Sequence, residues 1–181
     1  MAKRKKTTGR TTGKAATRGR QDAIALLKAD HRQVEGWFSQ FQKASASSRK
    51  QDLATKICQA LRVHTQIEEE IFYPAFLEAT EDKDLHHEAE IEHDGAKKLI
   101  AQIEKSDPSD DYYDARVKVL SEMIKHHVKE EEQPGGMFAE ARKSGMDLVE
   151  IGAQMKARKD ELSGKGQRGM AGANMERSIS M

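Results

Sequence analysis

Residues 53–72 read LATKICQALRVHTQIEEEIF, and this stretch decides the fold. Its apolar side chains return every three or four residues, which is the spacing of one face of an α-helix rather than of a strand. They are Leu53, Ile57, Ala60, Ile67 and Ile71. His64 and Glu68 stand on the same face, where further apolar residues are due. The stretch therefore predicts an amphipathic helix that buries one imidazole and one carboxylate.

Three other stretches repeat this pattern, and each places one histidine on its apolar face. The four histidines are His31, His64, His93 and His127. Ser-rich, acidic or Pro-containing segments separate the stretches, and they lie at 45–48, 81–84 and 106–110. Helices are predicted over 22–44, 49–79, 82–105 and 111–132. Short connections between such helices favour an all-α, up-down-up-down four-helix bundle.

The fourth helix ends at Pro134-Gly135-Gly136, and a short turn at 138–143 follows it. Residues 147–161 regain a helical pattern, which predicts an extra C-terminal helix packed outside the bundle. Gly, Ser and Met without periodicity then predict a disordered tail over 162–181. The chain is thus divided into a basic arm at 1–21, a helical domain at 22–161 and that tail.

Composition narrows the class of protein. The 181 residues are 36% hydrophobic, 34% charged and only 5% aromatic, which suits solvated helices and excludes a β-sandwich or barrel. The single cysteine, Cys58, cannot form an internal disulfide. No apolar run approaches the roughly 18 residues of a membrane helix, and no apolar signal region follows Met1. We therefore expect a soluble cytoplasmic protein without a membrane partner.

The arm at 1–21 carries eight basic residues and no acidic residue before Asp22. Because it has no large apolar residue after Met1, it cannot bury a core and is expected to be disordered. Three interpretations remain open, namely a solubilising tail, a nonspecific nucleic-acid arm and a targeting segment.

Histidines and carboxylates meet at one level of the predicted bundle. Counted from the loops that join their helices, the four histidines differ in depth by about one helical turn or less. Glu68 follows His64 by four residues, and Glu131 follows His127 in the same way, so each pair shares one helical face. Burying six such groups without a partner costs several kcal/mol per charged group, and a bound cation removes that cost. The predicted metal ligands are His31, His64, Glu68, His93, His127 and Glu131.

The types of ligand restrict which metal ion the site would bind. Imidazole and carboxylate without thiolate favour iron or manganese over structural zinc. Two carboxylates that can each bridge, with four histidines divided between the ends, suit two ions better than one. The competing interpretation is that single histidines are satisfied core residues and that the acidic runs 68–70 and 130–132 are solvated faces.

The His-x-x-x-Glu pair of the fourth predicted helix can be read in two registers. His126 and Glu130 are four residues apart, as are His127 and Glu131. His127 and Glu131 continue the apolar face of their helix, whereas His126 lies about 100° away from it. We therefore assign His127 and Glu131 as ligands and place His126 outside the ligand set.

These motifs resemble the hemerythrin family, specifically the bacterial HHE cation-binding proteins, over residues 22–161. The motifs that carry the resemblance are Asp30-His31, His64-x-x-x-Glu68-Glu69 with Tyr73-Pro74, Glu92-His93, and His126-His127-Val128-x-Glu130-Glu131-Glu132. The resemblance implies a centre of two non-haem iron ions with an oxo or hydroxo bridge. It also implies that one iron keeps a position open for O2 or a related small ligand.

One departure from the family bears on the ligand count. The oxygen-carrying members have a second histidine one turn after the third-helix histidine, and Lys97 stands there in this chain. His86 and Glu90 share a face with His93 and are the candidates to replace it, although a solvated position suits each of them better. A more open site favours reaction with peroxide or NO over reversible O2 storage.

Three functions remain in view. The first is a non-enzymatic di-iron protein that binds O2 or a similar ligand for sensing, storage or iron handling. The second is a di-iron enzyme that acts on peroxide or NO. The third is a stress-response protein whose basic arm binds DNA. The sequence leaves the oligomeric state open.

Overall fold

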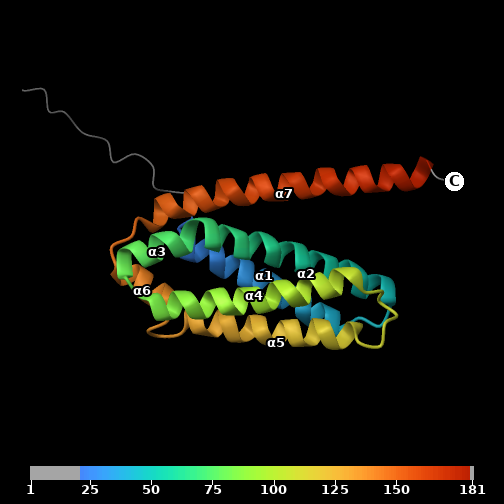
Figure 1. The fold of residues 1–181 in the computed structure, drawn as a ribbon, viewed down its shortest axis with the longest axis horizontal. Helices are drawn as coiled ribbons and strands as arrows, with labels where there is room; N and C mark the ends of the chain where they lie inside the picture. Colours follow the sequence, from blue (N-terminus) through green and yellow to red (C-terminus); the bar gives the residue numbers. More distant parts are fainter. Residues whose placement is uncertain (1–20, 180–181) are drawn as a thin grey trace, which may run out of the picture.

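The computed structural model describes residues 21–179, and side chains as far as Gly164. Four long helices run side by side in it (Figure 1). They are α1 (Ala23–Lys43), α2 (Ser47–Ile67), α4 (Lys83–Lys105) and α5 (Tyr113–Glu132). Each of α1 and α4 contacts both α2 and α5, so the four helices close into the predicted up-down-up-down bundle. The all-α prediction is confirmed.

The predicted basic arm lies outside the described residues, apart from Gln21. Nucleic-acid binding by this arm stays one of the three interpretations that the sequence leaves open. Among the helices of the described part, none is long and apolar enough to span a bilayer.

The second predicted helix, 49–79, is interrupted by a π-helical segment. After α2 the chain forms η1 (Glu68–Phe72) and then α3 (Tyr73–Thr80). The Tyr73 N–H donates to the carbonyl of Glu68, five residues earlier, and Pro74 has no N–H to offer an α-helical ladder. The wider turn rotates the buried face, so that Phe72 and Tyr73 are buried. Ile71, which the sequence pattern placed on the buried face, is only half-buried.

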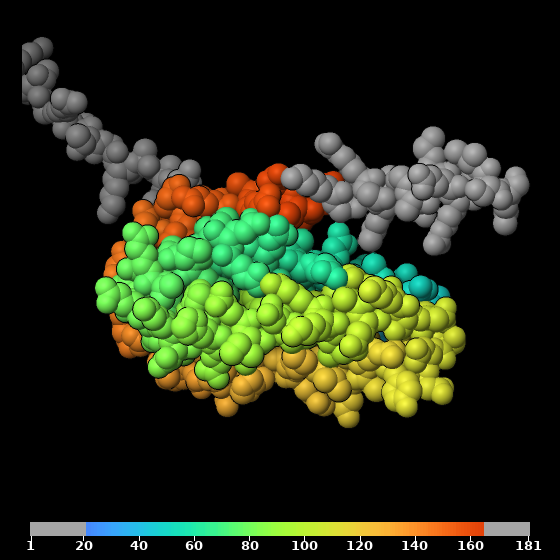
Figure 2. All heavy atoms as spheres, in the orientation of Figure 1, coloured from blue at the N-terminus to red at the C-terminus, as the bar shows by residue number. Residues whose placement is uncertain are grey.

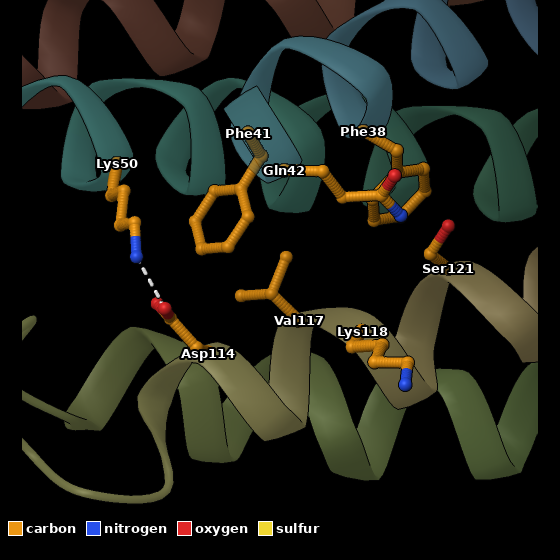
Figure 3. Close-up of a pocket in the computed structure, with 8 residues that line it drawn as sticks. All are labelled: Phe38, Phe41, Gln42, Lys50, Asp114, Val117, Lys118 and Ser121. Carbon is orange, nitrogen blue, oxygen red and sulfur yellow. Dashed lines mark hydrogen bonds and ion pairs between the residues drawn. The ribbon is translucent and has the colours of Figure 1, made fainter. Parts of the chain in front are cut away.

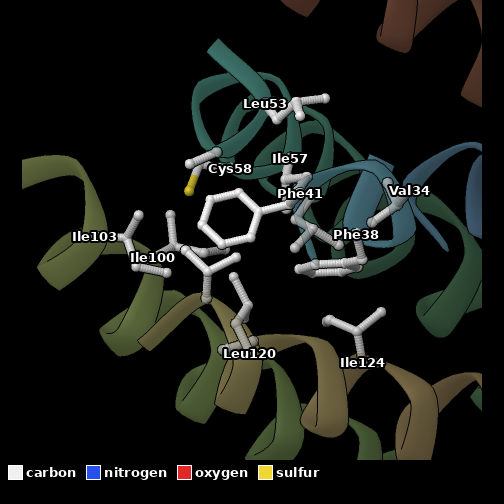
Figure 4. Close-up of a cluster of buried hydrophobic side chains, with 14 of the residues drawn as sticks. Val34, Phe38, Phe41, Leu53, Ile57, Cys58, Ile100, Ile103, Leu120 and Ile124 are labelled. Atoms are coloured by element: carbon white, nitrogen blue, oxygen red, sulfur yellow. The ribbon is translucent and has the colours of Figure 1, made fainter. Parts of the chain in front are cut away.

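The bundle holds two apolar clusters. The first contains Val34, Phe38, Phe41, Leu53, Ile57, Ile100, Leu120 and Ile124 (Figure 4). The second contains Ile24, Leu27, Ile67, Phe72, Phe76, Met137 and Phe138. On α1, His31 lies between Leu27 of the second cluster and Val34 of the first. The buried histidines therefore form a polar layer between two apolar ones.

Two further helices cover the bundle. The short helix α6 (Met137–Lys143) brings the ring of Phe138 parallel to that of His31, with 5.9 Å between the ring centroids. The long helix α7 (Leu148–Ile179) packs on α1 and α2, as the extra helix of the sequence analysis was expected to pack outside the bundle. Its backbone continues to Ile179, beyond the expected end at 161, through residues for which we expected a tail.

The contact of α7 with the start of α1 leaves no room for a side chain. A Cβ on Gly152 would lie 2.6 Å from the backbone nitrogen of Ala23 and 2.7 Å from the carbonyl oxygen of Gln21. We expect Gly152→Ala to lower the free energy of unfolding by about 1–3 kcal/mol, measured by chemical denaturation.

Gly36→Ala is the matched control for this prediction. Gly36 lies inside α1, and a Cβ added there would meet no atom within 4 Å, so alanine is expected to stabilise by about 0.5–1 kcal/mol. Equal effects of the two substitutions would contradict the close packing of α7 on α1.

Candidate metal centre

The structure brings all six predicted ligands together in the polar layer. They come from α1, α2, η1, α4 and α5, and none is more than 4% exposed. The residues concerned are His31, His64, Glu68, His93, His127 and Glu131. The agreement in depth follows from the helix lengths, because antiparallel neighbours of similar length place their midpoints side by side.

The six side chains form two donor groups that share Glu68. His31, His64, Glu68 and Glu131 make the first group, and Glu68, His93 and His127 make the second. Within each group, one donor atom of every residue lies within 4.8 Å of the others. The Nε2 atoms of His31 and His64 are 3.1 Å apart, and those of His93 and His127 are 3.3 Å apart.

Glu68 and Glu131 lie between the histidine pairs. The Glu68 Oε2 atom is 3.2 Å from His64 Nε2 and 3.4 Å from His93 Nε2, so one carboxylate reaches both groups. The Glu131 Oε2 atom is 3.4 Å from His31 Nε2 and 3.6 Å from His127 Nε2. Each carboxylate therefore approaches one histidine of each pair.

A second layer of carboxylates faces the outer nitrogen of every histidine. The Nδ1–carboxylate distances are 2.8 Å for His31–Glu132, 3.6 Å for His64–Asp30, 2.9 Å for His93–Glu69 and 2.7 Å for His127–Glu92. Each carboxylate belongs to a neighbouring helix and is adjacent in sequence to one of the six predicted ligands. Such outer partners fix the orientation of metal-binding imidazoles and raise their basicity.

These outer contacts determine where the imidazole lone pairs point. The Nδ1–H groups of His93 and His127 donate to Glu69 and Glu92, so the Nε2 atom of each ring carries a lone pair. Those two lone pairs face each other across 3.3 Å. A cation held between the rings and the carboxylates would turn this repulsion into coordination.

The two bridging carboxylates fit a cation for a second reason. All four carboxylate oxygens of Glu68 and Glu131 are buried, and none has a hydrogen-bond partner among the residues that the structure describes. Burial raises the pKa of Glu68 to about 7, and burial together with the charge of Glu68 raises that of Glu131 well above its usual value. Burial, followed by electrostatic interaction with His64 and His127, lowers the pKa of His31. The residues present therefore fit a metal centre.

Tyr73 contacts the centre, although from the sequence it is named only in a motif of the family resemblance and is assigned no role. Its hydroxyl lies 3.1 Å from His93 Nε2, and the side chain is buried. Burial, with the charges of Glu68 and Glu131, holds the pKa of Tyr73 well above its usual value, so the hydroxyl stays a donor. The sequence signal that could have revealed it is Pro74, because a proline in a helix disturbs the turn before it.

The remaining candidates lie outside this layer. His126 is 59% exposed, with Nε2 at 3.3 Å from Glu92. Lys97 extends its ammonium group to both oxygens of Glu69, at 2.5 and 2.6 Å. His86 and Glu90 lie in neither donor group, and the structure therefore does not bring them into the core.

A small cavity adjoins the histidines. Its volume is about 10 Å³, close to the space that one water molecule needs. Besides histidines, its walls include Val34, Leu61, Ile124 and Val128. The space beside the centre is thus apolar and admits only a very small ligand.

A larger pocket opens one helical turn away. It has a volume of about 350 Å³ and is lined by Phe38, Val117 and Ser121, with the ion pair of Lys50 and Asp114 at its rim (Figure 3). Phe38 follows Val34 by four residues on α1, and Ser121 precedes Ile124 by three on α5. The walls of the pocket and of the small cavity are therefore consecutive turns of the same helices.

Comparison with known proteins identifies similar chains. The family model of the hemerythrin HHE cation-binding domain matches residues 22–134. A solved HHE cation-binding domain-containing protein from Mycobacterium kansasii superposes with a TM-score of 0.69 at 24% identity, over 82% of this chain and 91% of that one. A DNA nickase from Nostoc sp. is 28% identical over 159 residues, which are 83% of this chain and 44% of the relative. This chain thus spans less than half the length of that relative.

Proposed function

This chain belongs to the hemerythrin HHE cation-binding domain family, and from that premise we propose that its buried centre holds two non-haem iron ions and takes O2 or a similar small molecule as ligand. His31 and His64 would be the nitrogen ligands of one ion, and His93 and His127 those of the other. Glu68 and Glu131 would bridge the pair, with an oxo or hydroxo group completing the bridge.

The observation that carries this proposal is the sharing of Glu68 between two buried donor groups. A single ion would use one group and leave the other with unpartnered imidazole and carboxylate atoms, at a cost of several kcal/mol. The absence of thiolate from either group favours iron over structural zinc.

When bound, an iron pair supplies the redox chemistry with which O2 and related molecules react. The chain's own residues supply the rest. Val34, Leu61, Ile124 and Val128 exclude bulk water from the space beside the histidines. The Tyr73 hydroxyl holds a proton 3.1 Å from His93 Nε2, on the side of the second donor group. With two histidines and the two shared carboxylates, each ion would have four protein ligands, which supports a position left open to a small molecule.

The test is an ultraviolet–visible spectrum of the full chain, reduced without air and then exposed to O2, with iron counted on the same sample. We expect two irons per chain and charge-transfer bands that appear with O2. If deoxygenation restores the starting spectrum, the protein is a carrier or sensor. Irreversible oxidation with turnover of peroxide or NO would instead assign the enzyme alternative. A reconstituted protein that holds no iron would overturn the proposal.

A further inference from the structure

The outer face of α4 carries a group of metal-binding residues that the buried centre does not use. One nitrogen of His86, one nitrogen of His87 and one oxygen of Glu90 lie within 4.8 Å of one another. We refer to these three residues as the α4 triad. It lies on the first turns of the helix, where Glu90 follows His86 by four residues and His87 by three, so the three side chains can converge.

His86 is held in place from its inner side. Its ring lies edge-on to Tyr73, with 5.8 Å between the centroids, and only 14% of its side chain is exposed. Its Nδ1 atom is buried, has no hydrogen-bond partner within the described part of the chain, and lies 3.5 Å from Glu90 Oε2. A buried ring nitrogen without a partner costs free energy, and a cation shared with Glu90 would remove that cost.

The ligand chemistry of the triad is that of a transition metal. Two imidazoles and one carboxylate, with the other positions open to water, form a set suited to Fe²⁺ and similar divalent ions. We propose that the α4 triad binds one divalent transition-metal cation at the surface and is the place where Fe²⁺ first stops on its way to the buried centre. The second half of this proposal rests on the proposed function, whereas the binding of a cation by the triad does not.

An open pocket lies beside the triad and extends to Glu69, an outer carboxylate of the centre. It has a volume of about 580 Å³ and is lined by Glu69, His87, Glu90, Ile91, Asp94 and Lys97. Its three carboxylates outnumber its one lysine, which gives it a negative field that concentrates cations. Of its lining residues, Glu69 accepts a hydrogen bond of 2.9 Å from His93 Nδ1.

Tyr73 makes a second, buried connection between the triad and the centre. Its ring contacts His86, and its hydroxyl lies 3.1 Å from His93 Nε2. Part of α4 lies on the face of the molecule that is turned to the viewer in Figure 2. A cation in the triad would therefore be accessible from solvent. Tyr73 would be the one side chain between His86 of the triad and His93 of the centre.

The first experiment counts ions on the full chain after its centre has been filled with iron. The protein is dialysed against Co²⁺, and cobalt and iron are both measured. We expect one Co²⁺ per chain with the iron retained. The double variant His86→Ala/His87→Ala should lose this ion, and Glu90→Gln, at an exposed position, should weaken its binding at least about tenfold.

His126→Ala is the matched control, because His126 is an exposed histidine 3.3 Å from a carboxylate but outside the triad. It should keep the Co²⁺. Absence of Co²⁺ from the wild-type chain, or equal binding by the triad variants, would overturn the cation site. If the centre holds no iron, the proposed function is overturned, and the triad is judged on the difference in bound Co²⁺ between the wild-type chain and the triad variants.

The second experiment measures how fast the apo chain takes up limiting Fe²⁺ without air, with a chelator stopping the reaction. We expect Glu90→Gln and the double variant to fill the centre about tenfold more slowly, with an unchanged final iron content. Equal rates would overturn the loading role. A centre that fails to fill in the wild-type chain would refute the proposed function instead.

Discussion

Glu68→Gln is expected to remove both ions from the centre at once. Glu68 is the one side chain that belongs to both donor groups, and its Oε2 atom lies within 3.4 Å of a histidine nitrogen in each. The amide keeps the volume of the side chain but offers neutral, poorer ligand atoms. We expect the iron content to fall at least about tenfold, measured after reconstitution by metal analysis. Retention of both ions would contradict the bridging role.

In the apo protein, Glu68→Gln should increase stability relative to the wild type as the pH rises. Burial raises the pKa of Glu68 from 4.5 to about 7, so the folded state favours the protonated carboxyl more than the unfolded state does. The protonated Glu68 carboxyl therefore contributes to the free energy of unfolding of the wild-type apo protein. This contribution is fully present below about pH 4.5 and is lost as the pH rises through about 7. The shift corresponds to a free energy on the order of 3 kcal/mol.

Denaturation of the two apo proteins between pH 5 and pH 8 measures this effect. The variant should gain stability relative to the wild-type apo protein as the pH rises, because glutamine does not ionise. A constant difference across the range would show that Glu68 does not carry the buried charge.

His127→Ala is the second substitution for which we expect a large effect. It removes His127 Nε2, which lies 3.3 Å from His93 Nε2. It also removes His127 Nδ1, the buried hydrogen-bond donor of Glu92. We expect loss of metal and a lower melting temperature of the holo protein, with a much smaller change in the apo protein.

His126→Ala is the control for this substitution, since it removes the neighbouring imidazole from the same turn of α5. That side chain is 59% exposed, and its loss should change neither iron content nor melting temperature appreciably. Complete loss of metal in His126→Ala would show that the assigned register is wrong by one residue.

The bundle could be predicted because its signal is repetitive. Apolar residues recur over four stretches, and the loops between them contain few residues, so little freedom remains in how such helices pack. The same periodicity brought His31, His64, His93 and His127 to one level. Each of them replaces an apolar residue on the face that the bundle buries, and the structure places all four in the polar layer.

The parts that could not be predicted depend on departures from the ideal helix and on contacts between helices. The π-helical turn at Glu68–Phe72 changes which residue follows Glu68 on the buried face, and a count by 3.6 residues selects Ile71 instead of Tyr73. The outer carboxylate Glu69 belongs to the acidic run 68–70, and Glu92 stands between Ile91 and His93, so neither is marked as a buried residue in the sequence. Only the approach of a neighbouring helix reveals that they hold His93 and His127.

The histidine–carboxylate contacts close into a circuit around the bundle. His31 of α1 contacts Glu132 of α5, and His127 of α5 contacts Glu92 of α4. His93 of α4 contacts Glu69 of η1, which directly follows α2. His64 of α2 contacts Asp30 of α1, and this contact closes the circuit. A slip of any one helix by a single residue would break two of these links. The circuit therefore makes the four helices one cooperative unit, and amide hydrogen exchange in the middle of all four should proceed through a single common opening.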